Sequence, residues 1–97
     1  MYELTPEKIA ELKAKYGKFY FIKVEGKAAV FRAPNRKELS YASLAGAKDP
    51  MKFNESIMNA CFVEGDKELI NDDDYFLGTS QQIANIIEVK ESSMEKY

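Results

Sequence analysis

Apolar side chains recur at helical spacing near the start of the chain. Thr5 is a favourable capping residue, and Pro6 suits the first position of a helix. Gly17 can end that helix because glycine tolerates the backbone conformation of a helix stop. The pattern therefore predicts a short amphipathic helix within residues 1–17. Its apolar face comprises Ile9, Leu12 and Tyr16.

The next segment alternates in the manner of β-structure. Residues 18–24 (K-F-Y-F-I-K-V) are rich in aromatic and β-branched side chains, and residues 28–32 provide a return strand. Glu25-Gly26-Lys27 supplies the turn between them. We therefore predict a two-stranded β-hairpin over residues 18–34. Alternation places Phe19, Phe21 and Lys23 on one face and Tyr20, Ile22 and Val24 on the other.

Both faces of this hairpin are apolar near the middle. Either the hairpin is covered on both sides, or one face contacts another molecule. The simpler interpretation has helices on one face and Tyr20 shielding the other. The alternative interpretation makes Phe19, Tyr20 and Phe21 candidate partner-binding residues.

The segment Val30–Ser40 joins the hairpin to a helical half of the chain. Pro34 ends the strand because proline cannot donate a backbone hydrogen bond to the sheet. Asn35 can cap the following helix, and Glu38 at the third helical position completes a capping box. Gly46 can end this helix.

Charge is distributed unevenly between the two halves. Residues 1–38 carry nine basic side chains and five Glu, whereas residues 39–97 carry five Lys and eleven acids. This asymmetry favours oriented contacts with a charged partner or a second copy of the chain, although ordinary solvated faces are the alternative. Within the chain, it suggests that the arginines after the hairpin pair with the acids of Asp72–Asp74. The expected structural joint comprises Arg32, Pro34 and Arg36.

A second capping residue followed by proline, Asp49-Pro50, begins another predicted helix. Met51 and Met58 lie off its apolar face, where their flexible side chains can fill gaps or line an adaptable partner-binding surface. We expect Cys61 to be a buried hydrophobe, because no acid–base partner lies near it in sequence to generate a thiolate. The apolar face comprises Phe53, Ile57, Ala60 and Cys61.

The last predicted helix begins near Asp73 and is expected to be the longest. Gly78 lies inside its pattern and lowers helix propensity. The acids between Asp66 and Asp74 lack the central glycine and closing glutamate of an EF-hand loop, so we interpret them as favourable charges at a helix start. The apolar line comprises Phe76, Ser80, Ile83 and Ile87, with Val89 and Met94 extending it. The polar residues after Lys90 are expected to fray.

These elements predict one α+β domain. An N-terminal helix (1–17) and a two-stranded β-hairpin (18–34) are followed by a three-helix C-terminal half (35–97). A chain of 97 residues and 11.1 kDa has no room for a second independent core. So small a core favours a homo-oligomer or a stabilising partner.

Composition narrows the function classes. The chain has no His, so it lacks the usual general base and the commonest metal ligand. Its single Cys excludes an internal disulfide, and its five scattered glycines form no phosphate-binding loop. We therefore expect no catalytic residues, no cofactor and no metal. The overall acidity disfavours nucleic-acid binding, and the absence of a signal-like start or a long apolar run predicts a cytoplasmic location without membrane association.

Four short motifs lie in the region after the hairpin. They are R-A-P-N-R-K-E-L (Arg32–Leu39), D-P-M-K-F-N-E-S-I-M-N-A-C-F-V-E-G-D (Asp49–Asp66), D-D-Y-F-L-G (Asp73–Gly78) and I-I-E-V-K-E (Ile86–Glu91). Together they resemble a family of small phage and prophage tail proteins, the tail assembly chaperones. In that family an R-x-P-x-R-x-E joint precedes a helix, and a later helix ends in a Cys-aromatic pair before an acidic loop. The resemblance covers roughly residues 18–91.

This resemblance implies a non-enzymatic protein of the bacterial host cytoplasm. Its implied partner is the tail tape-measure protein, whose long helical and apolar segments it would keep in solution before and during tail-tube assembly. Two other classes stay open. One is a phage or mobile-element adaptor or regulatory protein that binds a host protein, and the other is a structural component of the tail.

Overall fold

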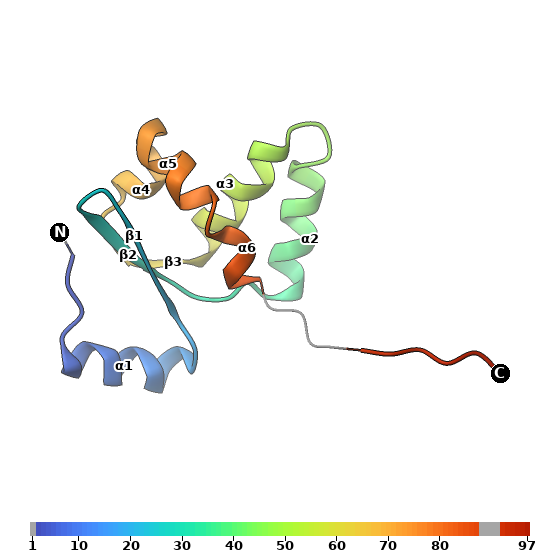
Figure 1. The fold of residues 1–97 in the computed structure, drawn as a ribbon, viewed down its shortest axis with the longest axis horizontal. Coiled ribbons are helices and arrows are strands. Elements are labelled where there is room, and N and C mark those ends of the chain that lie inside the picture. Colours follow the sequence, from blue (N-terminus) through green and yellow to red (C-terminus); the bar gives the residue numbers. More distant parts are fainter. Residues whose placement is uncertain (1, 88–91) are drawn as a thin grey trace.

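A three-stranded antiparallel sheet lies between a single helix on one face and a layer of helices on the other (Figure 1). The structure is a computed structural model that describes residues 2–87 and 92–97. In chain order the elements are α1 (Pro6–Tyr16), β1 (Tyr20–Val24), β2 (Lys27–Phe31), α2 (Arg36–Ala45), α3 (Pro50–Cys61), β3 (Phe62–Gly65), α4 (Glu68–Asn71), α5 (Asp73–Ser80) and α6 (Ile83–Ile86). The predicted α+β class is confirmed.

The sheet has the strand order β1-β2-β3, with β2 in the centre. The predicted hairpin forms β1 and β2, in register with Phe21 opposite Val30. The third strand is a correction, because residues 62–65 were placed in the helical C-terminal half, where no strand was predicted. β3 pairs antiparallel to β2 with an irregularity between Val30 and Phe31. Pairing with β3 satisfies the backbone hydrogen-bonding groups on the second edge of β2. In a lone two-stranded hairpin these groups would be unpaired.

The inner face of the sheet forms the main core with the helical layer. Ile22, Ala29 and Phe31 contribute from the strands, and the ring of Phe31 meets that of Phe62 edge to face at 5.7 Å. Burying each large side chain stabilises the fold by roughly 1.5–3 kcal/mol. The helices contribute the buried residues Ala42, Ile57, Met58, Cys61, Leu69, Ile83 and Ile86.

The outer face of the sheet is covered by α1 and the segment before it. Val30 and Ala28 are fully buried on this face, and Leu12 of α1 is also buried. Lys8 of α1 forms a 3.0 Å ion pair with Glu64 of β3, which fixes the helix over the sheet. The hairpin is therefore covered on both sides.

Helix starts follow the predicted capping residues. The Thr5 hydroxyl accepts a hydrogen bond from the Lys8 amide at the start of α1, which has proline in its first turn. At the start of α3, Asp49 accepts from the amide of Met51. The capping box at α2 is complete, because Asn35 and Glu38 each accept a hydrogen bond from the other's backbone amide.

The long last helix predicted from Asp73 is wrong. The chain instead forms α4, α5 and α6 in succession, and α3 with twelve residues is the longest helix in the described structure. Helix α5 does begin at Asp73, with Asp72 as its cap. A turn follows Ser80, in which the Gln82 amide donates to the Thr79 carbonyl at 3.0 Å. This turn redirects the chain so that α6 can place Ile83 and Ile86 in the core.

Gly78 has a packing role in α5. A Cβ at this position would lie 2.8 Å from Cγ1 of Val24 on β1, so glycine allows α5 to approach the sheet closely. The loss of helix propensity at Gly78 is therefore compensated by tertiary packing.

The end of the chain adds little to the described core. The expected contribution of Val89 lies outside the described residues. Met94 is exposed, and residues 92–97 contain no helix or strand. Over residues 2–87 and 92–97, no helix has both the length and the apolar character needed to cross a membrane.

Candidate interaction surface

The hairpin aromatics do not form a common exposed face. Tyr20 packs against the main core on the inner face, so the expectation that it shields the outer face is wrong. Phe21 lies on the outer face, where Tyr2 packs against it with ring centroids 6.2 Å apart. The Lys23 ammonium lies 5.3 Å from the centre of the same ring. Phe19 is half-buried just before β1. The N-terminal segment and the core thus occupy most of the surface proposed for a partner.

The two methionines of α3 lie in different environments. Met58 is completely buried in the main core, so its assignment to a partner-binding surface is wrong and it fills a gap instead. Met51 in the first turn of α3 is 40% exposed. Both residues lie off the predicted apolar face, but only Met58 is covered. The end of α5 lies against it, with the Ser80 hydroxyl 3.9 Å from its sulfur.

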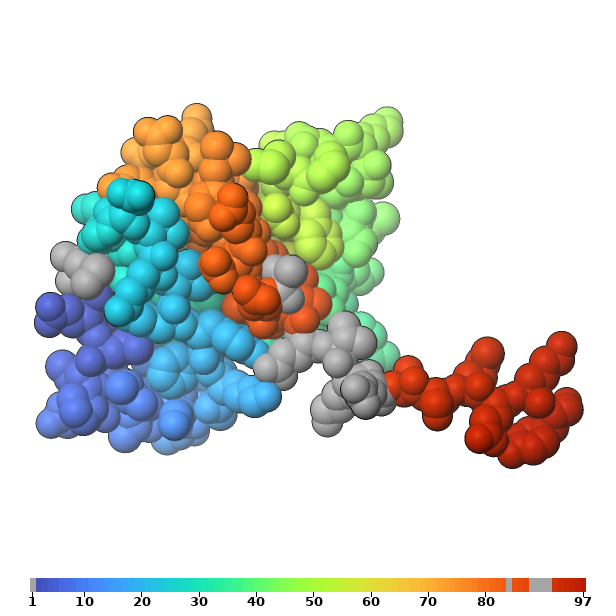
Figure 2. Space-filling model, in the orientation of Figure 1, coloured from blue at the N-terminus to red at the C-terminus, as the bar shows by residue number. Residues whose placement is uncertain are grey.

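Met51 lines a groove between α3 and the α4–α5 segment, which we call the α3–α5 groove. It has a volume of about 350 Å³. Leu77 on α5 is 58% exposed and stands on the opposite wall from Met51. The remaining lining residues are Glu55, Ile70, Asp73 and Phe76. In Figure 2 the orange surface of α5 borders the yellow-green surface of α3. The groove combines four apolar side chains with two carboxylates.

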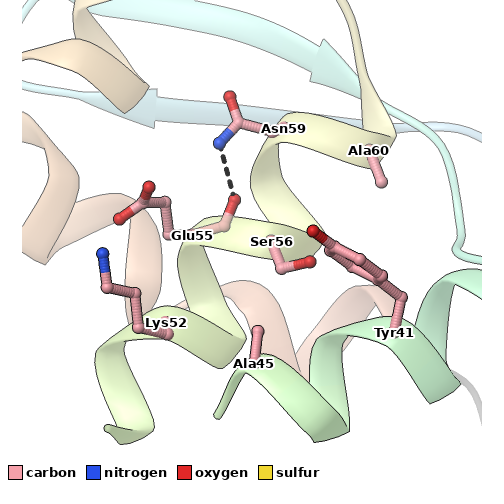
Figure 3. A pocket seen from close by; sticks show the side chains of 7 residues that line it. All are labelled: Tyr41, Ala45, Lys52, Glu55, Ser56, Asn59 and Ala60. Atoms are coloured by element: carbon pink, nitrogen blue, oxygen red, sulfur yellow. Dashed lines mark hydrogen bonds between the residues drawn. The ribbon is translucent and has the colours of Figure 1, made fainter.

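A second groove of about 490 Å³ lies between α2 and α3. Figure 3 shows the Tyr41 ring on the α2 side of it, facing the polar side chains of α3. Small residues, Ala45 and Ala60, leave room between the two helices. The polar wall comprises Lys52, Glu55, Ser56 and Asn59, with the Asn59 amide donating to the Glu55 carbonyl at 2.9 Å. Glu55 lines both grooves, which therefore lie on either side of α3.

The exposed side of α2 carries a patch of apolar and basic residues, Arg36, Lys37, Tyr41 and Leu44, which we call the α2 patch. Tyr41 is 69% exposed and Leu44 is 77% exposed, the two largest exposures among the large hydrophobic side chains that the structure describes within residues 2–87. Both belong to the same shallow depression as the two basic residues. Sequence periodicity did not single out Tyr41, Leu44 or Leu77. The available signal was that each is a large apolar residue off the core-facing line of its helix.

The joint after β2 is organised around Arg32. Its Nη1 and Nη2 donate to the two carboxylate oxygens of Glu38 at 2.9 and 2.6 Å, and Nη2 also donates to the Ala60 carbonyl at 2.7 Å. The guanidinium lowers the pKa of Glu38 to about 2. Arg32 therefore connects the strand to α2 and α3. The prediction that this arginine pairs with the acids of Asp72–Asp74 is wrong.

Arg36 and Pro34 play different parts from Arg32. Arg36 is exposed at the first position of α2 and forms no ion pair with any other described residue. Pro34 is half-buried in the extended link between β2 and the Asn35 cap. Of the three residues predicted to form the joint, only Arg32 thus bridges several elements through its side chain.

Among the described residues, few side chains are placed for nucleophilic or metal chemistry. Cys61 is fully buried at the end of α3, and burial raises the pKa of its thiol to about 11. A thiol with so high a pKa carries little thiolate near neutral pH. No group of three or more potential metal-ligating side chains occurs among residues 2–87 and 92–97. The Asp66 carboxylate instead accepts hydrogen bonds from the backbone amides of Ala28 and Tyr2, at 2.9 and 3.2 Å.

Comparison with known proteins adds no relative. No protein-family model, curated protein or solved structure matches this chain. The two grooves, the α2 patch and the motifs in the sequence are therefore the features that point to a function.

Proposed function

We propose that this protein is a non-enzymatic tail assembly chaperone of a phage or prophage, and that it binds the tape-measure protein in the cytoplasm of the bacterial host. Its client segments would be amphipathic helices with an apolar stripe. The chaperone would cover these stripes before and during assembly of the tail tube.

The observation that carries this proposal is the α3–α5 groove. Met51 and Leu77 are exposed on its two walls, and Ile70 and Phe76 supply further apolar lining. A groove between helices with apolar lining suits an amphipathic helix, whose side chains at i, i+3, i+4 and i+7 enter it. Methionine favours such a role because its unbranched side chain adapts to different apolar partners. A chaperone for a long helical client needs this tolerance.

The motif resemblance supplies the identity of the client. The R-A-P-N-R-K-E-L motif contains the Arg32–Glu38 pair and the capping box, and the later D-D-Y-F-L-G motif contains Asp73 and Leu77 of the groove. One motif thus lies at the joint that positions α2, and another lies on the proposed binding surface.

Co-expression tests the proposal directly. The tagged protein would be produced together with the tape-measure protein encoded in the same genome, and the soluble fraction would be purified and examined by size-exclusion chromatography. We expect a complex, and we expect more soluble tape-measure protein than without the chaperone. The double variant Met51→Glu, Leu77→Glu should lose the complex, because two charges would enter the apolar groove.

A matched control is Ala14→Glu, which adds a charge at an exposed position of α1 on the other side of the sheet. It should leave complex formation unchanged. If wild-type protein yields no complex with full-length or fragmented tape-measure protein, the chaperone proposal is wrong. Loss of binding in the Ala14→Glu variant would instead place the client surface on the α1 side.

A further inference from the structure

We propose that the α2 patch of one copy docks into the α3–α5 groove of a second copy, so that the protein assembles head to tail. The groove is the one that we assign to the client, but this contact requires no client. It would therefore form in the purified protein.

The α2 patch has the form of a helix that fits such a groove. Lys37, Tyr41 and Leu44 follow one another at spacings of four and three residues, so their side chains lie along one face of α2. Tyr41 and Leu44 are the apolar side chains of this face, and both are largely exposed. Within one copy, α2 packs on α3 around Ala42, which is fully buried, whereas Tyr41 lines the α2–α3 groove and is still 69% exposed. The patch is therefore available to a second molecule.

The charges of the two surfaces are complementary. Arg36 and Lys37 lie at the positive end of α2, and neither forms an ion pair with another described residue. The α3–α5 groove contributes Glu55 and Asp73, whose carboxylates likewise form no ion pair within residues 2–87 and 92–97. Some other charged side chains of the fold are paired internally, as Arg32 is with Glu38 and Lys8 with Glu64. An apolar stripe flanked by bases on one surface thus matches an apolar groove flanked by acids on the other.

The two surfaces lie in different parts of the helical layer. Helix α3 packs against both α2 and α5, and Figure 1 shows it between them. The α2 patch therefore cannot enter the groove of its own chain. A contact between unlike surfaces is heterologous, and its repetition produces either a closed ring or an open chain of subunits.

Self-docking would cover both exposed apolar surfaces before a client is present. A client helix would then compete with α2 of the neighbouring copy for the same groove, and each client bound would open one contact between copies. The oligomer would therefore be a storage form in which the groove is protected from nonspecific contacts.

Sedimentation velocity of the purified full-length protein tests this inference. We expect wild-type protein to associate as its concentration rises towards about 1 mM, the range in which weak interfaces are populated. The α2-blocked variant Tyr41→Glu, Leu44→Glu and the groove-blocked variant Met51→Glu, Leu77→Glu should each remain monomeric. Circular dichroism and the melting temperature should match wild type, since all four positions are exposed.

Mixing the two blocked variants is the decisive measurement. One intact patch and one intact groove remain in the mixture, so a 1:1 heterodimer should form and nothing larger should appear. A monomeric wild-type protein would overturn the inference, as would a blocked variant that still associates alone. A mixture that stays monomeric would also overturn it. None of these outcomes depends on whether the protein binds a tape-measure protein, so the two proposals can fail separately.

Discussion

Arg32 donates hydrogen bonds to both carboxylate oxygens of Glu38, at 2.9 and 2.6 Å, across the joint between β2 and α2. The same guanidinium reaches the Ala60 carbonyl in the last turn of α3, and the Arg32 amide donates to the Cys61 carbonyl at 2.9 Å. Glu38 also accepts a hydrogen bond from the Asn35 amide in the capping box. One ion pair thus connects the sheet, the start of α2 and the end of α3.

Removing Arg32 should therefore destabilise the fold. The variant Arg32→Ala leaves the half-buried Glu38 carboxylate without its charged partner and the Ala60 carbonyl without a donor. We expect a loss of about 2–3 kcal/mol in the free energy of unfolding, measured by urea denaturation. The matched control Arg36→Ala removes an exposed arginine of the same joint that forms no ion pair with another described residue, and should change stability by no more than about 0.5 kcal/mol. Equal effects of the two substitutions would contradict the role assigned to Arg32.

The same pair predicts an acid-dependent part of the stability. The pKa of Glu38 is lowered from 4.5 to about 2 in the folded protein, chiefly by hydrogen bonds from Arg32. Since the unfolded chain takes up the proton first, the stabilising contribution is complete above pH 4.5 and disappears as the pH falls towards 2. The stability difference between wild type and Glu38→Gln should therefore shrink over that range. A difference that stays constant between pH 5 and pH 2 would exclude this linkage.

Gly65 is predicted to tolerate no side chain. Its φ is +130°, and a Cβ there would lie 2.5 Å from the Cα of Ala29 in the neighbouring strand. Gly65→Ala should cost about 2–4 kcal/mol in the free energy of unfolding, because backbone strain and overpacking act together. Gly26→Ala is the control, with a φ of +81° but nothing within 4 Å of the added Cβ, and should cost only about 1–2 kcal/mol.

The turn between β1 and β2 offers a stabilising substitution. Glu25 has a φ of +46° and Gly26 also has a positive φ, a combination that hairpin turns of type I′ require. Asparagine adopts such a conformation more easily than glutamate does. Glu25→Asn should therefore raise the free energy of unfolding by about 0.5–1 kcal/mol, visible as a higher melting temperature. A lower melting temperature would mean that the Glu25 side chain makes a favourable contribution of its own.

Truncation of the two methionines of α3 should affect stability to very different extents. Met58→Ala removes a fully buried side chain and should cost about 2–5 kcal/mol of stability. Met51→Ala should leave stability within about 0.5 kcal/mol of wild type, because the side chain lies at the rim of the α3–α5 groove. If the proposed function is correct, only Met51→Ala weakens client binding at a temperature where both variants are folded. A stable Met58→Ala variant with impaired binding would reverse this assignment.

Local signals were sufficient to predict much of the fold. Thr5-Pro6, Asn35 with Glu38, and Asp49-Pro50 placed three helix starts, because a cap and its first turn are contiguous in sequence. The candidate site was predicted less well. Met51 belongs to the α3–α5 groove, but Leu77 stands on its other wall and comes from a helix more than twenty residues later. No local spacing relates those two positions.

The sequence by itself determined the starts of α1, α2, α3 and α5, the hairpin, the α+β class and the burial of Cys61, since each depends on neighbouring residues or on a strong apolar preference. Tertiary structure decided which surfaces remain open. It paired Arg32 with Glu38 rather than with distant acids, covered Met58 while leaving Met51 exposed, and added β3 to the free edge of β2. It also broke the last helical segment, because a turn after Ser80 separates α5 from α6, whose Ile83 and Ile86 enter the core. Except for the Arg32–Glu38 pair, whose partners lie six residues apart, these outcomes depend on contacts between segments far apart in the chain, and a local pattern carries no information about such contacts.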